Sequence, residues 1–138
     1  MARFWMASVV MAPRDFEAAW APLIGKDGAV ELRRYRKLSM ARPLVAFLAA
    51  GAGALIGRGG AGNVIGIICG VAAVGLVGAY IRAQWRTTRA IGAWFGVKRL
   101  GWNLRWTPQR FDESRKRRGL MTPDERLAAA MATDHSDE

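Results

Sequence analysis

The sequence has very few of the side chains that build most catalytic and metal sites. It contains one cysteine, Cys69, and one histidine, His135, in 138 residues. One cysteine allows no intrachain disulfide, and one cysteine with one histidine is too few for a zinc site. There is also no Cys–His pair and no carboxylate dyad suited to catalysis. We therefore expect no enzyme, no cofactor and no metal site, with His135 a solvated residue of an acidic tail.

Charge is missing from the middle of the chain. The net charge is +10 and 51% of the residues are apolar, yet residues 43–81 contain a single charged side chain, Arg58. A chain that is both basic and apolar is expected beside nucleic acid or an anionic membrane. Because the basic residues flank a long uncharged block, we expect an anionic phospholipid membrane.

The uncharged block divides into two apolar runs. Residues 43–57 and 64–81 would form helices about 22 and 27 Å long, joined by a loop at 58–63. The second run is long enough to span a bilayer, and the first needs Leu38–Arg42 or the glycine linker to do so. The predicted fold is an all-α membrane protein with a two-helix transmembrane hairpin; a shallow re-entrant hairpin is the alternative. Arg42 and Arg58 would snorkel toward head groups.

The linker contains a G-x-G-x-x-G motif, formed by Gly57, Gly59 and Gly62. A dinucleotide fingerprint needs a strand before the motif, an amphipathic helix after it and an acidic residue about 20 positions further on. Here the next acidic residue is Asp112, and residues 64–81 contain no charged side chain for a water-facing side. The motif is therefore interpreted as a hairpin bend.

Small residues recur every four positions in both runs, which places them along one ridge of each helix. Such ridges allow helices in lipid to pack closely through small-xxx-small contacts, within one chain, between chains, or both. The predicted packing residues are Ala49, Gly53 and Gly57 in the first helix and Gly62, Gly66, Gly70 and Gly78 in the second.

The glycine spacing is similar to that of a known family. Gly53, Gly57, Gly62, Gly66 and Gly70 resemble the pattern of the glycine-zipper two-transmembrane proteins of bacterial envelopes, over about 35 of the 138 residues. The longer layout is similar to that of small inner-membrane proteins of bacteria. These resemblances imply a mode of helix packing and no reaction.

The N-terminal segment, residues 1–42, is predicted to be helical and basic. An amphipathic helix over 13–24 would present Phe16, Ala19, Trp20 and Leu23 on one face and end at Gly25. Asp27 would cap a second helix over 28–38. Residues 1–12 are expected to be an interfacial turn or an over-extended start, with a cleaved signal as the alternative.

The C-terminal part divides into two predicted segments. Residues 82–106 are rich in Trp and Arg, as in an aromatic belt beside a membrane, and Leu100–Trp106 alternates as a short strand would. Within residues 107–138, Thr107 and Thr122 each precede a proline and would cap helices, the second with Glu125 in a capping box. Gly119 would end the first helix, and the final six residues are expected to be disordered.

Positive charge on both sides of the block places both termini in the cytoplasm of a bacterium, with the hairpin in the inner membrane. The predicted head-group residues are Arg33, Arg34, Arg36, Lys37, Arg42, Arg82, Arg86, Arg89, Trp85 and Trp94.

Three functions follow from these patterns. The first is a structural, assembly or accessory subunit that acts through glycine-mediated packing, as a homo-oligomer or as part of a membrane complex. The second is a holin-like pore former, although the long basic flanks are more than a holin needs. The third is nucleic-acid binding through Arg115–Arg118 and the Trp-rich stretch. The third is disfavoured, since these charges lie at a helix C-terminus and beside a membrane.

Overall fold

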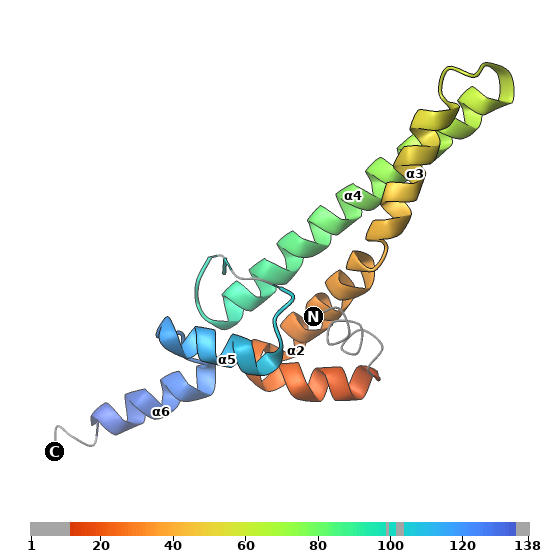
Figure 1. Cartoon of the computed structure of the whole chain (residues 1–138). Helices are drawn as coiled ribbons and strands as arrows, with labels where there is room; N and C mark the ends of the chain where they lie inside the picture. Colours follow the sequence, from red (N-terminus) through yellow and green to blue (C-terminus); the bar gives the residue numbers. More distant parts are fainter. Residues whose placement is uncertain (1–11, 99, 102–103, 135–138) are drawn as a thin grey trace. The chain divides into compact units, whose positions relative to one another are not determined.

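The computed structural model describes residues 12–98, 100–101 and 104–134, and these contain helices and no strand (Figure 1). The all-helical prediction is therefore confirmed for this part of the chain. The helices are α2 (Pro13–Ser39), α3 (Arg42–Leu55), α4 (Gly60–Trp94), α5 (Pro108–Arg117) and α6 (Pro123–Asp134). Two helical stretches, Pro13–Leu55 and Gly60–Trp94, are long and apolar enough to cross a membrane.

Helix α2 bends at Gly25, the residue where the sequence predicted a helix end. Gly25 has φ 75° and ψ 162°, a conformation that strongly favours glycine. The buried face before the bend consists of Phe16, Trp20 and Ile24. The predicted face was partly wrong, because Ala19 is exposed and Leu23 only half-buried. Residues four apart form the buried row here, without the i+3 positions.

A two-residue turn, Met40 and Ala41, separates α2 from α3. The amide of Ala41 donates to the carbonyl of Leu38 at 3.0 Å, the tighter i to i−3 pattern. Pro43 lies at the start of α3, where its missing N–H costs no hydrogen bond. In a continuous helix the same proline would leave the carbonyl of Ser39 without its donor, so the chain restarts instead.

The hairpin bend between α3 and α4 is shorter than predicted. Helix α4 begins at Gly60, so Gly62 lies inside its first turn instead of in a loop at 58–63. Gly57, Gly59 and Gly60 have φ of 97°, 77° and 51°. The amide of Gly57 donates to Oδ1 of Asn63 at 2.7 Å, which ties the bend to α4. The G-x-G-x-x-G motif thus joins two helices and has no strand before it.

The chain divides into two compact units. One, called unit 1, comprises Met1–Arg33 and Arg86–Glu138; the other, unit 2, comprises Arg34–Trp85. Helices α2 and α4 contribute residues to both units. Unit 2 contains the whole of α3 and the first 26 residues of α4.

Unit 1 has an aromatic core that the sequence analysis did not anticipate. The ring centroid of Phe111 lies 6.0 Å from that of Trp20 and 5.9 Å from that of Phe95. Leu100 and Leu104 are also buried. The predicted strand over 100–106 is absent at the described positions 100–101 and 104–106. Leu100 and Leu104 are four residues apart and would share one face of a strand, so their burial agrees with the alternation although no strand forms at these positions.

The helix ends in unit 1 follow the predicted punctuation. Thr107 Oγ1 accepts from the amide of Arg110 at 3.4 Å, and Thr122 and Glu125 form a reciprocal capping box. Gly119, at φ 66°, follows the last residues of α5. Helix α6 continues to Asp134, so the first two residues of the predicted disordered tail are helical. His135 lies outside the described residues.

Candidate functional site

The seam between α3 and α4 in unit 2 is built from small residues of α4 and the Ala52 side of α3. Figure 1 shows these helices side by side. A Cβ atom at Gly66 would lie 2.9 Å from Cγ1 of Ile56, 3.1 Å from its backbone nitrogen and 3.3 Å from the carbonyl oxygen of Ala52. At Gly70 it would lie 3.8 Å from Cβ of Ala52. Ala52 is buried, as is Ala73 one turn further along α4.

The predicted packing residues therefore divide into two sets. Gly62, Gly66 and Gly70 do lie against α3. Ala49, Gly53 and Gly57, the predicted ridge of α3, are exposed, and a Cβ at either glycine would meet nothing within 4 Å. The same holds for Gly78 in α4. The predicted α3 residues do not contribute to the seam because Ala52 and Leu55 lie on the side of α3 that faces α4.

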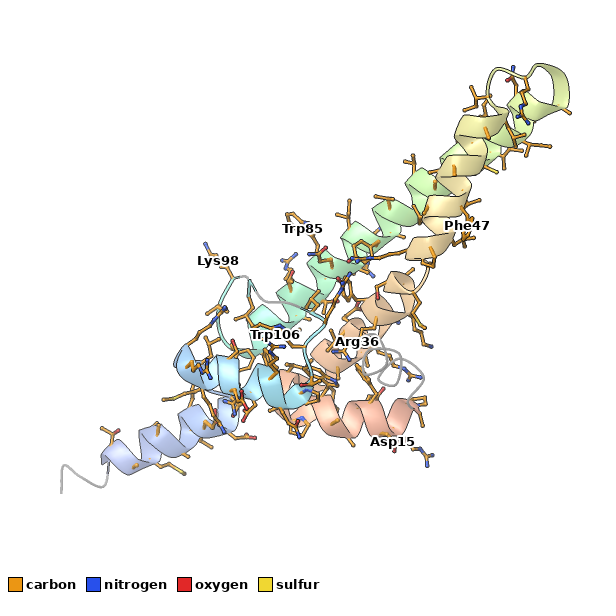
Figure 2. All side chains as sticks on the ribbon, in the orientation of Figure 1. Asp15, Arg36, Phe47, Trp85, Lys98 and Trp106 are labelled. Atoms are coloured by element: carbon orange, nitrogen blue, oxygen red, sulfur yellow. The ribbon has the colours of Figure 1, made fainter. Side chains whose placement is uncertain are left out.

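Large apolar side chains cover much of the remaining surface of unit 2. Phe47 is 76% exposed and Val74 is 74% exposed, and Figure 2 shows Phe47 on the outside of α3. Exposure of this kind continues along both helices, in contrast to the buried core of unit 1. The other exposed members in unit 2 are Leu44, Ile56, Val64, Ile65, Ile67, Ile68, Val71, Val77, Ile81 and Trp85.

A cluster of two tyrosines and one arginine lies at the end of the seam away from the bend. The Oη atoms of Tyr35 and Tyr80 are 2.6 Å apart, and their rings are 5.2 Å apart. Arg42 donates a hydrogen bond to Oη of Tyr80, and its guanidinium carbon lies 4.8 Å from the centre of that ring. Burial raises the pKa of Tyr35, and the hydrogen bond with Tyr80 raises it further.

A half-open pocket of about 190 Å³ adjoins this cluster. Its walls are mainly aliphatic, and its polar edge is made by Arg42 and Tyr80. The residues that line it are Leu38, Ala41, Arg42, Val45, Leu76, Val77 and Tyr80. All of them belong to unit 2, and they come from the end of α2, the turn, α3 and α4.

Most of the predicted head-group residues lie at the surface. The seven exposed members are Arg34, Lys37, Arg42, Arg82, Trp85, Arg86 and Arg89. The other three differ, and Arg33 is half-buried. Arg36 is 2% exposed, and burial lowers its pKa to about 10, so it keeps its charge at neutral pH. The six-membered ring of Trp94 lies against Gly25, where a Cβ would be only 2.5 Å away.

The position of Trp94 has a physical reason. Gly25 leaves a gap at the bend of α2, and the ring of Trp94 fills it within unit 1. The carbonyl of Trp94 also accepts a hydrogen bond from Arg126 at 3.0 Å, which joins α6 to the end of α4. Trp94 is therefore a packing residue of unit 1, where the sequence analysis placed it beside head groups.

The two tyrosines and Ala52 were not among the residues predicted from the sequence. Tyr35 and Tyr80 are the only tyrosines in the chain, and each stands beside basic residues at an end of the apolar block. Tyrosine in such a place is typical of a membrane–water interface, so a signal was present. Ala52 had no comparable signal, because alanine or glycine occurs on most sides of α3.

Comparisons with known protein families, with curated protein sequences and with solved structures found no match to the chain.

Proposed function

We propose that the protein is a small integral membrane protein that acts as a structural, assembly or accessory subunit, without catalysis. The supporting observation is that unit 2 has small residues at the seam between its helices and large aliphatic residues exposed on both helices. Contiguous apolar surface of this extent is unusual on a soluble monomer. A bilayer would cover it, and close packing of glycine and alanine is how helices associate in lipid.

The exposed side of α3 is the proposed assembly face. Ala46, Ala50 and Gly53 recur at spacings of four and three residues, and all are exposed. They lie on one side of α3, because steps of three and four residues return to the same side of a helix. A second copy of the hairpin or another membrane subunit would approach the backbone of α3 closely there. The proposal agrees with the resemblance to glycine-zipper two-transmembrane proteins.

The proposed location is the bacterial inner membrane, with both termini in the cytoplasm. Residues 34–85 contain six Lys or Arg and no Asp or Glu, and only Arg58 among them lies at the bend. Positive charge concentrated at the other end favours a cytoplasmic position for that end.

The test compares cross-linked oligomers of the full chain and of two variants in native membranes. Gly53→Leu adds a bulky side chain to the proposed assembly face and is expected to lower the oligomer yield about tenfold, the effect of losing about 1.4 kcal/mol. Val74→Leu, on the exposed side of α4, is the matched control and should leave the yield unchanged. An unchanged yield for Gly53→Leu would refute assembly through α3.

The same membranes are washed with alkaline carbonate. The chain is expected to stay in the membrane pellet, since integral helices resist this treatment. Release into the supernatant would overturn the membrane proposal itself, and with it every statement about lipid contact. The two measurements therefore test insertion and assembly separately.

A further inference from the structure

We propose that unit 2 binds one anionic phospholipid in the pocket beside Arg42 and Tyr80. The phosphate would bind at Arg42, and part of one acyl chain would occupy the aliphatic pocket. The inference rests on the proposed membrane location and adds to it a defined site and a class of ligand.

The pocket has the size and chemistry for a piece of hydrocarbon. An apolar cavity of about 150 Å³ in a protein core stays dry and holds a benzene molecule. The pocket of unit 2 measures about 190 Å³, and Leu38, Val45, Leu76 and Val77 form most of its wall. Water would find few polar partners against such a wall. A segment of several methylene groups would fill the space and remain in contact with the surrounding acyl chains through the open side.

The polar edge of the pocket holds a guanidinium in a fixed position. Arg42 is exposed, stacks on the ring of Tyr80 and donates to its hydroxyl. An arginine has five N–H donors in a planar fork, which suits the bidentate binding of a phosphate. Because Tyr80 holds the side chain and Tyr35 holds Tyr80, little conformational freedom remains to be lost when a phosphate binds.

The electrostatics of unit 2 favour an anion at this edge. No acidic residue occurs among residues 34–85, so no carboxylate of this unit competes for Arg42. Helix α3 begins at Arg42, has no acidic residue in its first turn and has no side-chain cap. The positive end of its dipole adds to the charge of Arg42. A free phosphate ion would satisfy the arginine alone, whereas a phospholipid satisfies both the arginine and the aliphatic wall.

The test uses the full chain in phosphatidylcholine bilayers that contain a trace of phosphatidylglycerol with a diazirine on its acyl chain. Photo-adducts are expected on residues of the pocket wall. Val77→Trp places a large ring in the pocket and should lower the adduct yield about tenfold. Val74→Trp adds the same ring outside the pocket and should leave the yield unchanged. Equal yields for both variants would overturn the site.

A second measurement isolates the phosphate contact without filling the pocket. Unlabelled phosphatidylglycerol should compete for the site about tenfold better than phosphatidylcholine or diacylglycerol, and Arg42→Gln should remove that preference. Equal competition by all three lipids in the unmodified chain would refute a phosphate contact. Displacement by inorganic phosphate would identify the ligand as a free ion and would also refute the lipid proposal.

A carbonate wash of the same bilayers separates this inference from the proposed function. If the chain remains in the pellet and shows no preference for phosphatidylglycerol, the site is refuted and membrane insertion stands. If the chain is released, both proposals fail together.

Discussion

At Gly66 the backbones of two helices meet with no space for a side chain. The backbone nitrogen of Ile56 and the carbonyl oxygen of Ala52 both lie close to where a Cβ would be, and neither atom can rotate away as the end of a side chain would. The three glycines of α4 that face α3 thus differ in tolerance. Gly70 has room for a methyl group, and Gly66 does not.

We therefore predict that Gly66→Ala destabilises the hairpin by about 1–3 kcal/mol, as overpacking of a tight core does. Gly75→Ala is the matched control, because a Cβ at Gly75 meets nothing within 4 Å in the same helix. The measurement is reversible unfolding of the full chain in mixed detergent micelles. Equal stability of the two variants would contradict the close contact at Gly66.

Sequence periodicity identified the glycine ridge of α4 but not its counterpart in α3. Gly62, Gly66 and Gly70 recur every four residues, and valine and isoleucine lie between them. The small side of α4 was therefore evident from the sequence. Alanine or glycine occupies most sides of α3, and nothing in its sequence marks the side of Ala52. The conformation of the bend sets the direction of α4, and that direction determines which small side of α3 faces α4. This is a three-dimensional property.

At the scale of the helices, α4 and α5 both end just before a glycine with positive φ. Gly96 and Gly119 both have positive φ. The amide of Val97 donates to the carbonyl of Gly92, and that of Leu120 donates to Arg115, in the hydrogen-bond pattern of a Schellman motif. The sequence analysis recognised Gly119 and placed the end of α4 at Ile81, before the first arginine of the basic stretch. A change from apolar to basic residues marks a membrane boundary, and a helix can continue through it.

An ion pair between buried Arg115 and exposed Glu125 joins α5 to α6. Arg115 is 6% exposed, and its guanidinium donates to both carboxylate oxygens of Glu125, at 2.5 and 2.9 Å. Its Nε donates to Asp112 at 2.6 Å. These hydrogen bonds raise the pKa of Arg115. The hydrogen bond that Glu125 accepts from Arg115 is the main cause that lowers the pKa of Glu125 to about 2. From the sequence, Arg115 was predicted to lie at a basic helix end or in a nucleic-acid contact, since its partner Glu125 is ten residues away.

The pKa of Glu125 predicts how the contact between α5 and α6 depends on pH. The ordinary value for this carboxyl is 4.5, and its folded value is lower, so the folded state binds the proton less tightly than the unfolded state. The stabilisation should be complete above about pH 5 and should be lost as the pH falls toward 2. The carboxyl carbon of Glu125, followed by NMR in micelles, should titrate with a midpoint near 2.

The variant Glu125→Gln tests the same contact by mutation. Glutamine can still complete the capping box with Thr122, so the change removes the charge and leaves the cap. We expect α6 to become more accessible to limited proteolysis at neutral pH. Glu113→Gln, on the exposed side of α5, is the control. A midpoint near 4.5 for Glu125, or equal cleavage of the two variants, would contradict a role for the ion pair.

For the whole molecule, the charge distribution predicts the topology in the membrane. In a Cys69→Ala background, Arg58→Cys should react with a membrane-impermeant maleimide added outside spheroplasts, because Arg58 lies at the exposed bend. Lys116→Cys, in the C-terminal part, should react only after permeabilisation. If Arg58→Cys does not react before permeabilisation, the result would favour the re-entrant hairpin. Labelling of Lys116→Cys from outside would contradict a cytoplasmic tail.

The sequence was more informative about the hairpin than about unit 1. An uncharged block between basic flanks is a local pattern, and it can be read without knowledge of the fold. The core of unit 1 joins Trp20, Phe95 and Phe111, which are distant in the sequence. Aromatic residues in a basic segment match an interfacial belt as well as a core, and only the fold distinguishes them.

The unequal distribution of small residues between α3 and α4 has a consequence for symmetry. Outward-facing small residues form a continuous row on α3, whereas the outward side of α4 is dominated by valine and isoleucine. Two copies that meet through α3 would be related by a twofold axis, and each would use the same small-residue face. Such a contact is isologous, so growth stops at the dimer. A contact from α3 of one copy to α4 of the next would leave a free surface at each end and would continue until a ring closed. Counting subunits therefore distinguishes the two arrangements.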